Sequence, residues 1–155
     1  MINTPVTMEL PIYFKPVEEF CLLDELWYDG GRLGAKISIH SAEGRFPDLE
    51  GIDIALIGVY EDRGSLANFG CADAPDWVRK FLYRLYQGSW QAKIADLGNI
   101  RSGDRLEDTY FALRNVIAYL LRSNIVPVII GGSQDLTYAN YLAYESMGKI
   151  INIVS

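Results

Sequence analysis

The chain has little cysteine and histidine, and no excess of basic residues. Its two cysteines, Cys21 and Cys71, form neither a C-x-x-C pair nor a disulfide framework, so we expect both to be reduced packing residues. The 14 basic and 20 acidic residues give a net charge of −6. A nucleic-acid-binding protein usually carries a basic surface, so we expect no nucleic-acid partner.

Long apolar runs are missing as well. No hydrophobic stretch approaches the length of a membrane-spanning helix. Residues 1–10 lack the basic segment followed by an apolar segment that marks a secretory signal. We therefore expect no membrane association, and a cytoplasmic location by default. Half of the 155 residues are hydrophobic, which is enough for the core of one domain.

Three short apolar, β-branched runs predict buried strands, at residues 52–59, 93–97 and 126–130. Residues 149–155 form a similar run and predict a fourth strand. Pro127 has no backbone N–H, so it should lie near the start of its strand or face no hydrogen-bonding partner. A buried parallel strand normally continues into a loop. A chain that ends within one is therefore expected to be the first part of a larger fold.

Helices are predicted between these strands, near residues 75–87, 105–122 and 135–146. Asp73 is a candidate N-cap of the first helix, and Asp104 with Glu107 stand in capping-box register ahead of the second. Apolar residues of the first helix recur at helical spacing and form one face: they are Trp77, Val78, Phe81, Leu82 and Leu85.

Alternating strands and helices with short links are typical of right-handed βαβ units on a parallel sheet. The sequence therefore predicts an α/β fold. The first fifty residues have a weaker pattern. Residues 14–26 could form a short helix broken by Pro16, and residues 35–40 could form an edge strand.

Ligands of open α/β sheets bind outside the carboxyl ends of the strands. The loops that qualify are residues 61–64, 98–99 and 131–135. Asp62 and Asp135 could be ligands or acids, but a turn and a helix cap explain them as well. The single histidine, His40, lies outside these loops, and the motifs GxGxxG, Walker A and GxSxG are absent. These residues alone identify no reaction.

The third predicted strand and its turn resemble a known motif. Residues 126–135 read VPVIIGGSQD. In the arginase/agmatinase/formimidoylglutamase (ureohydrolase) family, a run of the form P-V-hydrophobic-G-G-D-H-S supplies the first metal-binding histidine. Residues 57–64, 74–79 and 95–99 resemble further family segments in matching order. The resemblance covers roughly residues 51–155 and looks most like the formimidoylglutamase branch.

The resemblance implies a three-layer α/β/α fold with a parallel sheet, of the arginase/deacetylase type, truncated after the fourth core strand. Residues 1–155 would be a single domain, in which 1–50 form an N-terminal extension and 51–155 the βαβ core. The first strand would lie between the second and the third. Family members hydrolyse C–N bonds of guanidino or formimino groups, with a hydroxide shared by two manganese ions.

At the family's metal position, this sequence departs from the motif. Gln134 stands where the family has its histidine, and Ser133 where it has an aspartate. A neutral amide oxygen is a poorer ligand than imidazole for such a metal. The family's other ligands belong to a D-A-H-x-D motif, which would begin where the chain ends at Ser155, and to a later D-x-D motif. We therefore expect no catalytic residue and no bound manganese in this chain, with Gln134 as the single candidate at a metal-ligand position.

Two hypotheses about the function remain open. The chain is either the N-terminal part of a hydrolase, inactive alone, or a non-catalytic scaffold or oligomerisation module of a pseudo-enzyme. A third reading, a nucleotide binder, would depend on fold analogy alone. In the complete family fold, later strands separate the fourth strand from the third, so the 126–130 edge would be bare here. We expect a partner subunit of a homo-oligomer, the missing C-terminal portion, or residues 149–155 to cover it.

Overall fold

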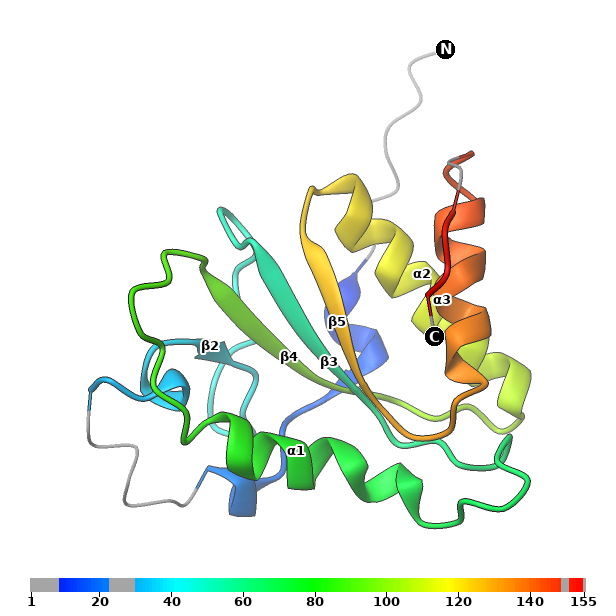
Figure 1. Cartoon of the computed structure of the whole chain (residues 1–155), viewed down its shortest axis with the longest axis horizontal. Coiled ribbons are helices and arrows are strands. Elements are labelled where there is room, and N and C mark those ends of the chain that lie inside the picture. The colour runs from blue at the N-terminus through cyan, green and yellow to red at the C-terminus, as the bar shows by residue number, and fades with distance from the viewer. Residues whose placement is uncertain (1–8, 23–29, 149–150, 155) are drawn as a thin grey trace.

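The computed structural model describes residues 9–22, 30–148 and 151–154. Its centre is a parallel sheet of three strands, in the order β4, β3, β5 (Figure 1). The strands are β3 (Ile54–Val59), β4 (Ile94–Ile100) and β5 (Val126–Gly131). The three strands predicted from apolar runs are confirmed, and so is the position of the first of them in the middle.

Two short strands share the outer edge of β4. Strand β1 (Phe14–Lys15) pairs with it antiparallel at Asn99 and Ile100, and β2 (Ser38–Ile39) pairs parallel at Ala95 and Asp96. The edge strand predicted within residues 35–40 is confirmed in a shorter form. The helix predicted within 14–26 is wrong for the described residues, because they form β1 and a single 3₁₀ turn, Glu19–Cys21. Residues 23–26 lie outside the described part.

In the described residues, α1 (Ala74–Leu82) connects β3 to β4, α2 (Leu106–Arg122) connects β4 to β5, and α3 (Leu136–Glu145) follows β5. Leu97 of β4 belongs to the apolar core together with Leu113 and Ile117 of α2. Its neighbour Asp96 instead bonds to Arg79 of α1. Because successive side chains of a strand point to opposite faces, α1 and α2 cover opposite faces of the sheet. The predicted three-layer α/β/α arrangement is confirmed, with α3 beside α2 (Figure 1).

Helix α1 turns its polar side toward the sheet. Its buried residues are Pro75, Asp76 and Arg79, whereas most of the apolar face is exposed. The exposed fractions are 56% for Trp77, 43% for Val78, 60% for Phe81 and 57% for Leu85, which follows the helix. The apolar face predicted for α1 is therefore present. In the described part of the chain it is exposed and does not pack against the sheet.

The helix boundaries differ from the predicted ones in two places. Helix α1 ends at Leu82 instead of near residue 87, since the carbonyl groups of Tyr83 and Leu85 accept hydrogen bonds from Gly34 and Leu33. These long-range bonds replace the helical pattern. Helix α2 has Arg105 as its N-cap residue, so the capping box predicted at Asp104 and Glu107 is wrong by one residue. Instead, the Asp108 carboxylate accepts the backbone N–H of Arg105 at 3.0 Å.

The predicted fourth strand is not formed by Ile151–Val154, which have no regular secondary structure. They lie beside α3, where they line a hollow together with Thr137, Asn140, Tyr141 and Tyr144 (Figure 1). The expectation that residues 149–155 cover the edge of β5 is therefore wrong for the described four. Among the described strands, β5 pairs with β3 alone. No helix in the described part of the chain could span a membrane.

Candidate functional site at the carboxyl edge of the sheet

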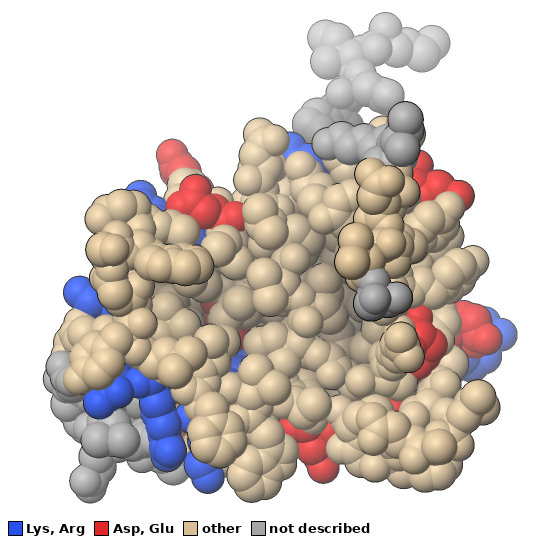
Figure 2. Space-filling view, viewed as in Figure 1, with Lys and Arg blue, Asp and Glu red and all other residues tan. Residues whose placement is uncertain are grey.

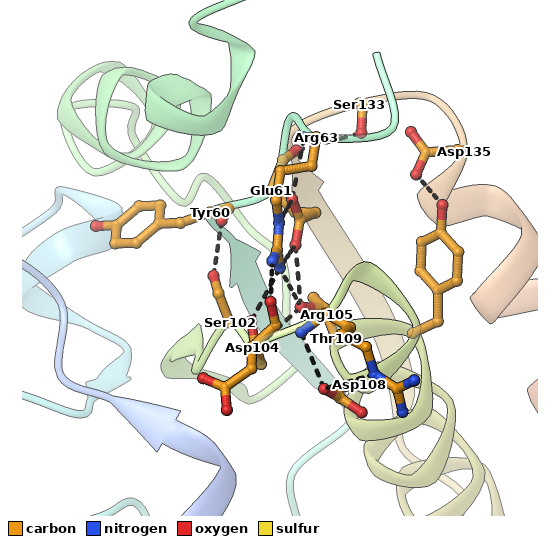
Figure 3. Close-up of polar contacts among 12 residues, drawn as sticks. Tyr60, Glu61, Arg63, Ser102, Asp104, Arg105, Asp108, Thr109, Ser133 and Asp135 are labelled. Carbon is orange, nitrogen blue, oxygen red and sulfur yellow. Dashed lines mark hydrogen bonds and ion pairs between the residues drawn. The ribbon is translucent and has the colours of Figure 1, made fainter.

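The loops that follow β3, β4 and β5 meet at one edge of the sheet, and Glu61 joins them. Its side chain is almost fully buried, 1% exposed. Arg63 donates to one carboxylate oxygen from Nε at 2.9 Å and to the other from Nη2 at 2.6 Å, and the Thr109 hydroxyl also donates, at 3.0 Å. Figure 3 shows these groups converging. The hydrogen bonds from Arg63 lower the pKa of Glu61, although burial alone would raise it.

The same cluster holds the neighbouring backbone. Arg63 donates to the carbonyl oxygens of Gly103 and Asp104, at 3.0 and 2.9 Å. The carbonyl oxygen of Glu61 accepts the backbone N–H of Ser133 at 2.8 Å. Gly132 is required at this close approach, because a Cβ there would lie 1.8 Å from that oxygen. Glu61 and the Arg63 side chain that it holds therefore link all three loops.

Asp135 occupies the N-cap position of α3 but makes no capping hydrogen bond from its side chain. Its Oδ2 instead accepts a hydrogen bond from Tyr110 of α2 (Figure 3), and its buried Oδ1 has no partner. Burial and the carboxylate both raise the pKa of Tyr110. The alternative reading of Asp135 as a helix cap is wrong, because the carboxylate links α2 to the loop that precedes α3.

Of the other predicted site residues, Gln134 shares a hollow with Asp135, whereas Asp62 and His40 have partners elsewhere. Asp62 accepts the backbone N–H of Gly70 at 2.9 Å, which is the ordinary role of a turn-forming aspartate. Gln134 is exposed and lines an open hollow of about 510 Å³ with Asp135 and residues 64–68. His40 lies on the opposite side of the sheet, where its Nδ1 is 3.0 Å from the carbonyl oxygen of Leu97. It is a structural residue of the β2 edge.

A second buried cluster, which sequence reasoning did not assign, lies under α1. Arg79 is fully buried and binds Asp96 in a bidentate pair, with both N–O distances 2.8 Å. It also donates to Asn99 at 2.6 Å and to the carbonyl oxygen of Gly98 at 3.0 Å. Tyr83 adds a third donor to Asp96, at 2.8 Å. Burial lowers the pKa of Arg79, but Asp96 more than offsets this and keeps the guanidinium charged.

This cluster explains two further sequence features. Gly58 lacks a Cβ because one would overlap the side chains of Asn99 and Arg79. Cys21 packs against the same region, with its thiol donating to the carbonyl oxygen of Asp76 at 3.6 Å. Burial raises the pKa of Cys21 to about 12, so this thiol is a packing group, as predicted. Cys71 is also free and half-buried. The sequence did contain one signal for this cluster, because Arg79 lies on the polar side of an amphipathic helix.

The residues present do not fit a binuclear manganese site. Such a site needs several carboxylate or imidazole ligands converging on each metal. Within the described ranges, no three His, Cys, Asp or Glu side chains are grouped closely enough to hold a metal ion. Gln134 supplies a neutral amide, Asp135 is bonded to Tyr110, and Asp62 is bonded to Gly70.

Comparisons with known proteins agree with the fold described above and with the motif at residues 126–135. The sequence profile described as "Arginase family" matches residues 52–155. The chain belongs to the arginase family. A formimidoylglutamase of Geobacillus thermodenitrificans is 36% identical over 123 residues, 74% of this chain and 37% of that protein. One from Streptococcus gordonii is 29% identical over 65% of this chain and 32% of its own length. The chain thus spans about a third of these relatives.

Solved structures support the same family. The structure of a Trypanosoma cruzi formiminoglutamase with Mn²⁺ has a TM-score of 0.60 at 27% identity, over 72% of this chain and 39% of that one. An agmatine ureohydrolase of Thermoplasma volcanium has a TM-score of 0.57 at 20% identity, over 63% and 36%. The second likeness shows the fold alone. The first is a formiminoglutamase that holds Mn²⁺.

Proposed function

We propose that this chain is the N-terminal part of a formimidoylglutamase-like hydrolase, and that it is inactive by itself. The parent class hydrolyses C–N bonds of guanidino or formimino groups with two manganese ions. Support for the branch comes from the similarity of 74% of the chain to a formimidoylglutamase at 36% identity. This chain contributes β3, β4, β5 and the loops at their carboxyl edge.

One observation carries the proposed inactivity: the carboxyl edge has no convergent set of metal ligands among the described residues. Two carboxylates there are bonded within the chain: Arg63 and Thr109 bind Glu61, and Tyr110 binds one oxygen of Asp135. Gln134, at the family's histidine position, is an exposed neutral amide. A single imidazole at this position would bring one ligand, whereas two metals need several.

Calorimetric titration with Mn²⁺ tests this proposal directly. We expect no binding with a Kd near 1 µM or below for the chain, and none for the Gln134→His variant. Neither protein should hydrolyse formiminoglutamate, arginine or agmatine. Gln134→Ala is the matched control, because it removes the amide from the same exposed position. Micromolar binding that Gln134→Ala abolishes would contradict the proposal, as would activity that Gln134→His restores.

The alternative function, a non-catalytic scaffold or oligomerisation module, is favoured by one observation. Helix α1 and the residues that follow it expose large apolar side chains that a monomeric soluble domain usually buries. They are Trp77, Phe81, Leu85, Tyr86 and Trp90. The gene sequence downstream distinguishes the two functions. An intact D-x-H-x-D motif there would favour the hydrolase, and its loss would favour the scaffold.

A further inference from the structure

A further hollow lies at the amino ends of the parallel strands, at the opposite end of the sheet from the loops that Glu61 links. Its volume is about 370 Å³, and it is built by the start of β4, the residues around the start of β2 and the loop that leads from α1 into β4. These segments lie at the edge of the sheet away from β5 (Figure 1). Strands that the family adds later in the chain would extend the sheet beyond β5, so they do not border this hollow.

Two lysine side chains line this hollow, Lys36 and Lys93. In the parallel pair of β2 with β4, Ser38 stands opposite Ala95, and each lysine comes two residues before one of these partners. The pairing of β2 with β4 therefore brings both amines to one place. Figure 2 shows Lys and Arg side chains on the left side of the molecule, where β2 and the loop into β4 lie in Figure 1.

No carboxylate within the described ranges forms an ion pair with either amine. The ion pairs between described residues belong to Arg63, Arg79 and Arg105. Asp53 lies next to Lys93, but its Oδ2 accepts the backbone N–H of that residue, at 2.8 Å. Like charges placed side by side on paired strands destabilise a fold. A bound anion would relieve this repulsion.

The backbone under both lysines is held in place. The N–H of Lys36 donates to the carbonyl oxygen of Leu33 at 2.9 Å, at the end of a 3₁₀ turn. The carbonyl oxygen of Lys93 accepts the N–H of Asp53, also at 2.9 Å. Because both side chains start from fixed points, a ligand between them orders only the side chains themselves, which lowers the entropic cost of binding.

The rest of the lining suits a flat ring. Ile37, Ile52 and Ile94 are half-buried and supply apolar walls. Trp90 also lines the hollow and is 70% exposed, so its indole can stack on a planar ring. The exposed hydroxyl of Ser38 adds a hydrogen-bond donor beside the lysines.

We propose that this hollow binds a small organic phosphate with a planar ring, of the nucleoside monophosphate class. A phosphate monoester carries about −1.5 to −2 charges at pH 7, which matches the two ammonium groups, and lysine binds phosphate as a point charge. The ring lies against Trp90 and the isoleucine walls. The volume is near the lower end of the roughly 300–1,000 Å³ of ligand pockets, which suits a mononucleotide. This inference goes beyond the proposed hydrolase function and involves none of its metal positions.

Titration of the chain with AMP, followed by NMR of the backbone amides, tests the site. We expect a Kd of about 1 mM or below, with shifts confined to the residues that line the hollow. Lys36→Gln and Lys93→Gln should each raise the Kd about fivefold or more, because each removes a charged donor to the phosphate. Lys15→Gln is the matched control, since it removes the same charge from an exposed residue at the other end of β4, and it should leave the Kd unchanged. The same spectra report whether each variant keeps the fold.

Further titrations separate the ring from the phosphate. Adenosine lacks the phosphate and inorganic phosphate lacks the ring, so each should bind more weakly than AMP. Trp90→Leu should raise the Kd for AMP about fivefold or more and leave that for inorganic phosphate unchanged. The absence of amide shifts at about 10 mM AMP would overturn the proposal, as would inorganic phosphate that binds as tightly as AMP. Equal weakening by Lys15→Gln and by the two variants in the hollow would overturn it too, because it would show general charge attraction and no site.

Discussion

Replacing Arg79 by methionine would leave Asp96 as a buried carboxylate without its counter-charge. Both side chains are fully buried, and Asp96 accepts four hydrogen bonds: two from Arg79, one from Tyr83 and one from the backbone N–H of Gly98. The substitution removes two of the four and the positive charge that Arg79 pairs with the carboxylate. Breaking a buried pair from one side costs about 3–5 kcal/mol, a large part of the roughly 5–15 kcal/mol that stabilises a typical domain.

Urea unfolding measured by circular dichroism gives the magnitude. With a slope of about 2 kcal/mol per M, the midpoint of Arg79→Met should fall by about 2 M. The double variant Arg79→Met/Asp96→Asn should recover more than about 1 kcal/mol, because it leaves no unbalanced charge buried and the amide oxygen still accepts from Tyr83 or from Gly98. Lys80→Met makes the same change on the outer side of α1 and should stay within about 0.5 kcal/mol. A loss below about 1 kcal/mol for Arg79→Met, or strict additivity in the double variant, would refute the reasoning.

Two further predictions concern the loop cluster. Folding lowers the pKa of Glu61 from its ordinary value of 4.5. The charge of Glu61 therefore stabilises the fold fully above that pH, and this stabilisation is lost as the pH falls through the lower folded-state pKa. The difference in melting temperature between the chain and Glu61→Gln should narrow below about pH 4.5, and a constant difference would show that the charge is not responsible. Gly132→Ala should cost about 1–3 kcal/mol by overpacking, because its Cβ would overlap Glu61, whereas Gly30→Ala, with no atom within 4 Å, should be nearly neutral. Equal effects of the two glycine variants on the urea midpoint would contradict the close approach at Gly132.

The strands were predictable because their signal is local. A buried parallel strand is a short apolar run, and β3, β4 and β5 each lie within or close to the predicted bounds. Pro127 lies second in β5, near the start of its strand, as its missing N–H predicts. The end of α1 was not predictable in this way, since the bonds that stop it come from Leu33 and Gly34, about fifty residues earlier in the chain.

The site shows the same limit. The motif that ends in Gln134 and Asp135 placed both residues at the carboxyl edge, as found. The partners of the buried carboxylates could not be read from spacing, because Glu61 meets Thr109 across 48 positions and Asp135 meets Tyr110 across 25. A capping role for Asp135 was reasonable from local sequence, but the hydroxyl of Tyr110 takes the place of the helix N–H groups.

Helix α1 shows why an amphipathic pattern predicts a face without predicting which side is inside. Burying Arg79 requires acceptors for its donors, and Asp96, Asn99 and the carbonyl group of Gly98 supply them on the sheet. The apolar side of the helix is then turned outward, and it can be covered only by packing, since a helix has no free main-chain groups along its length.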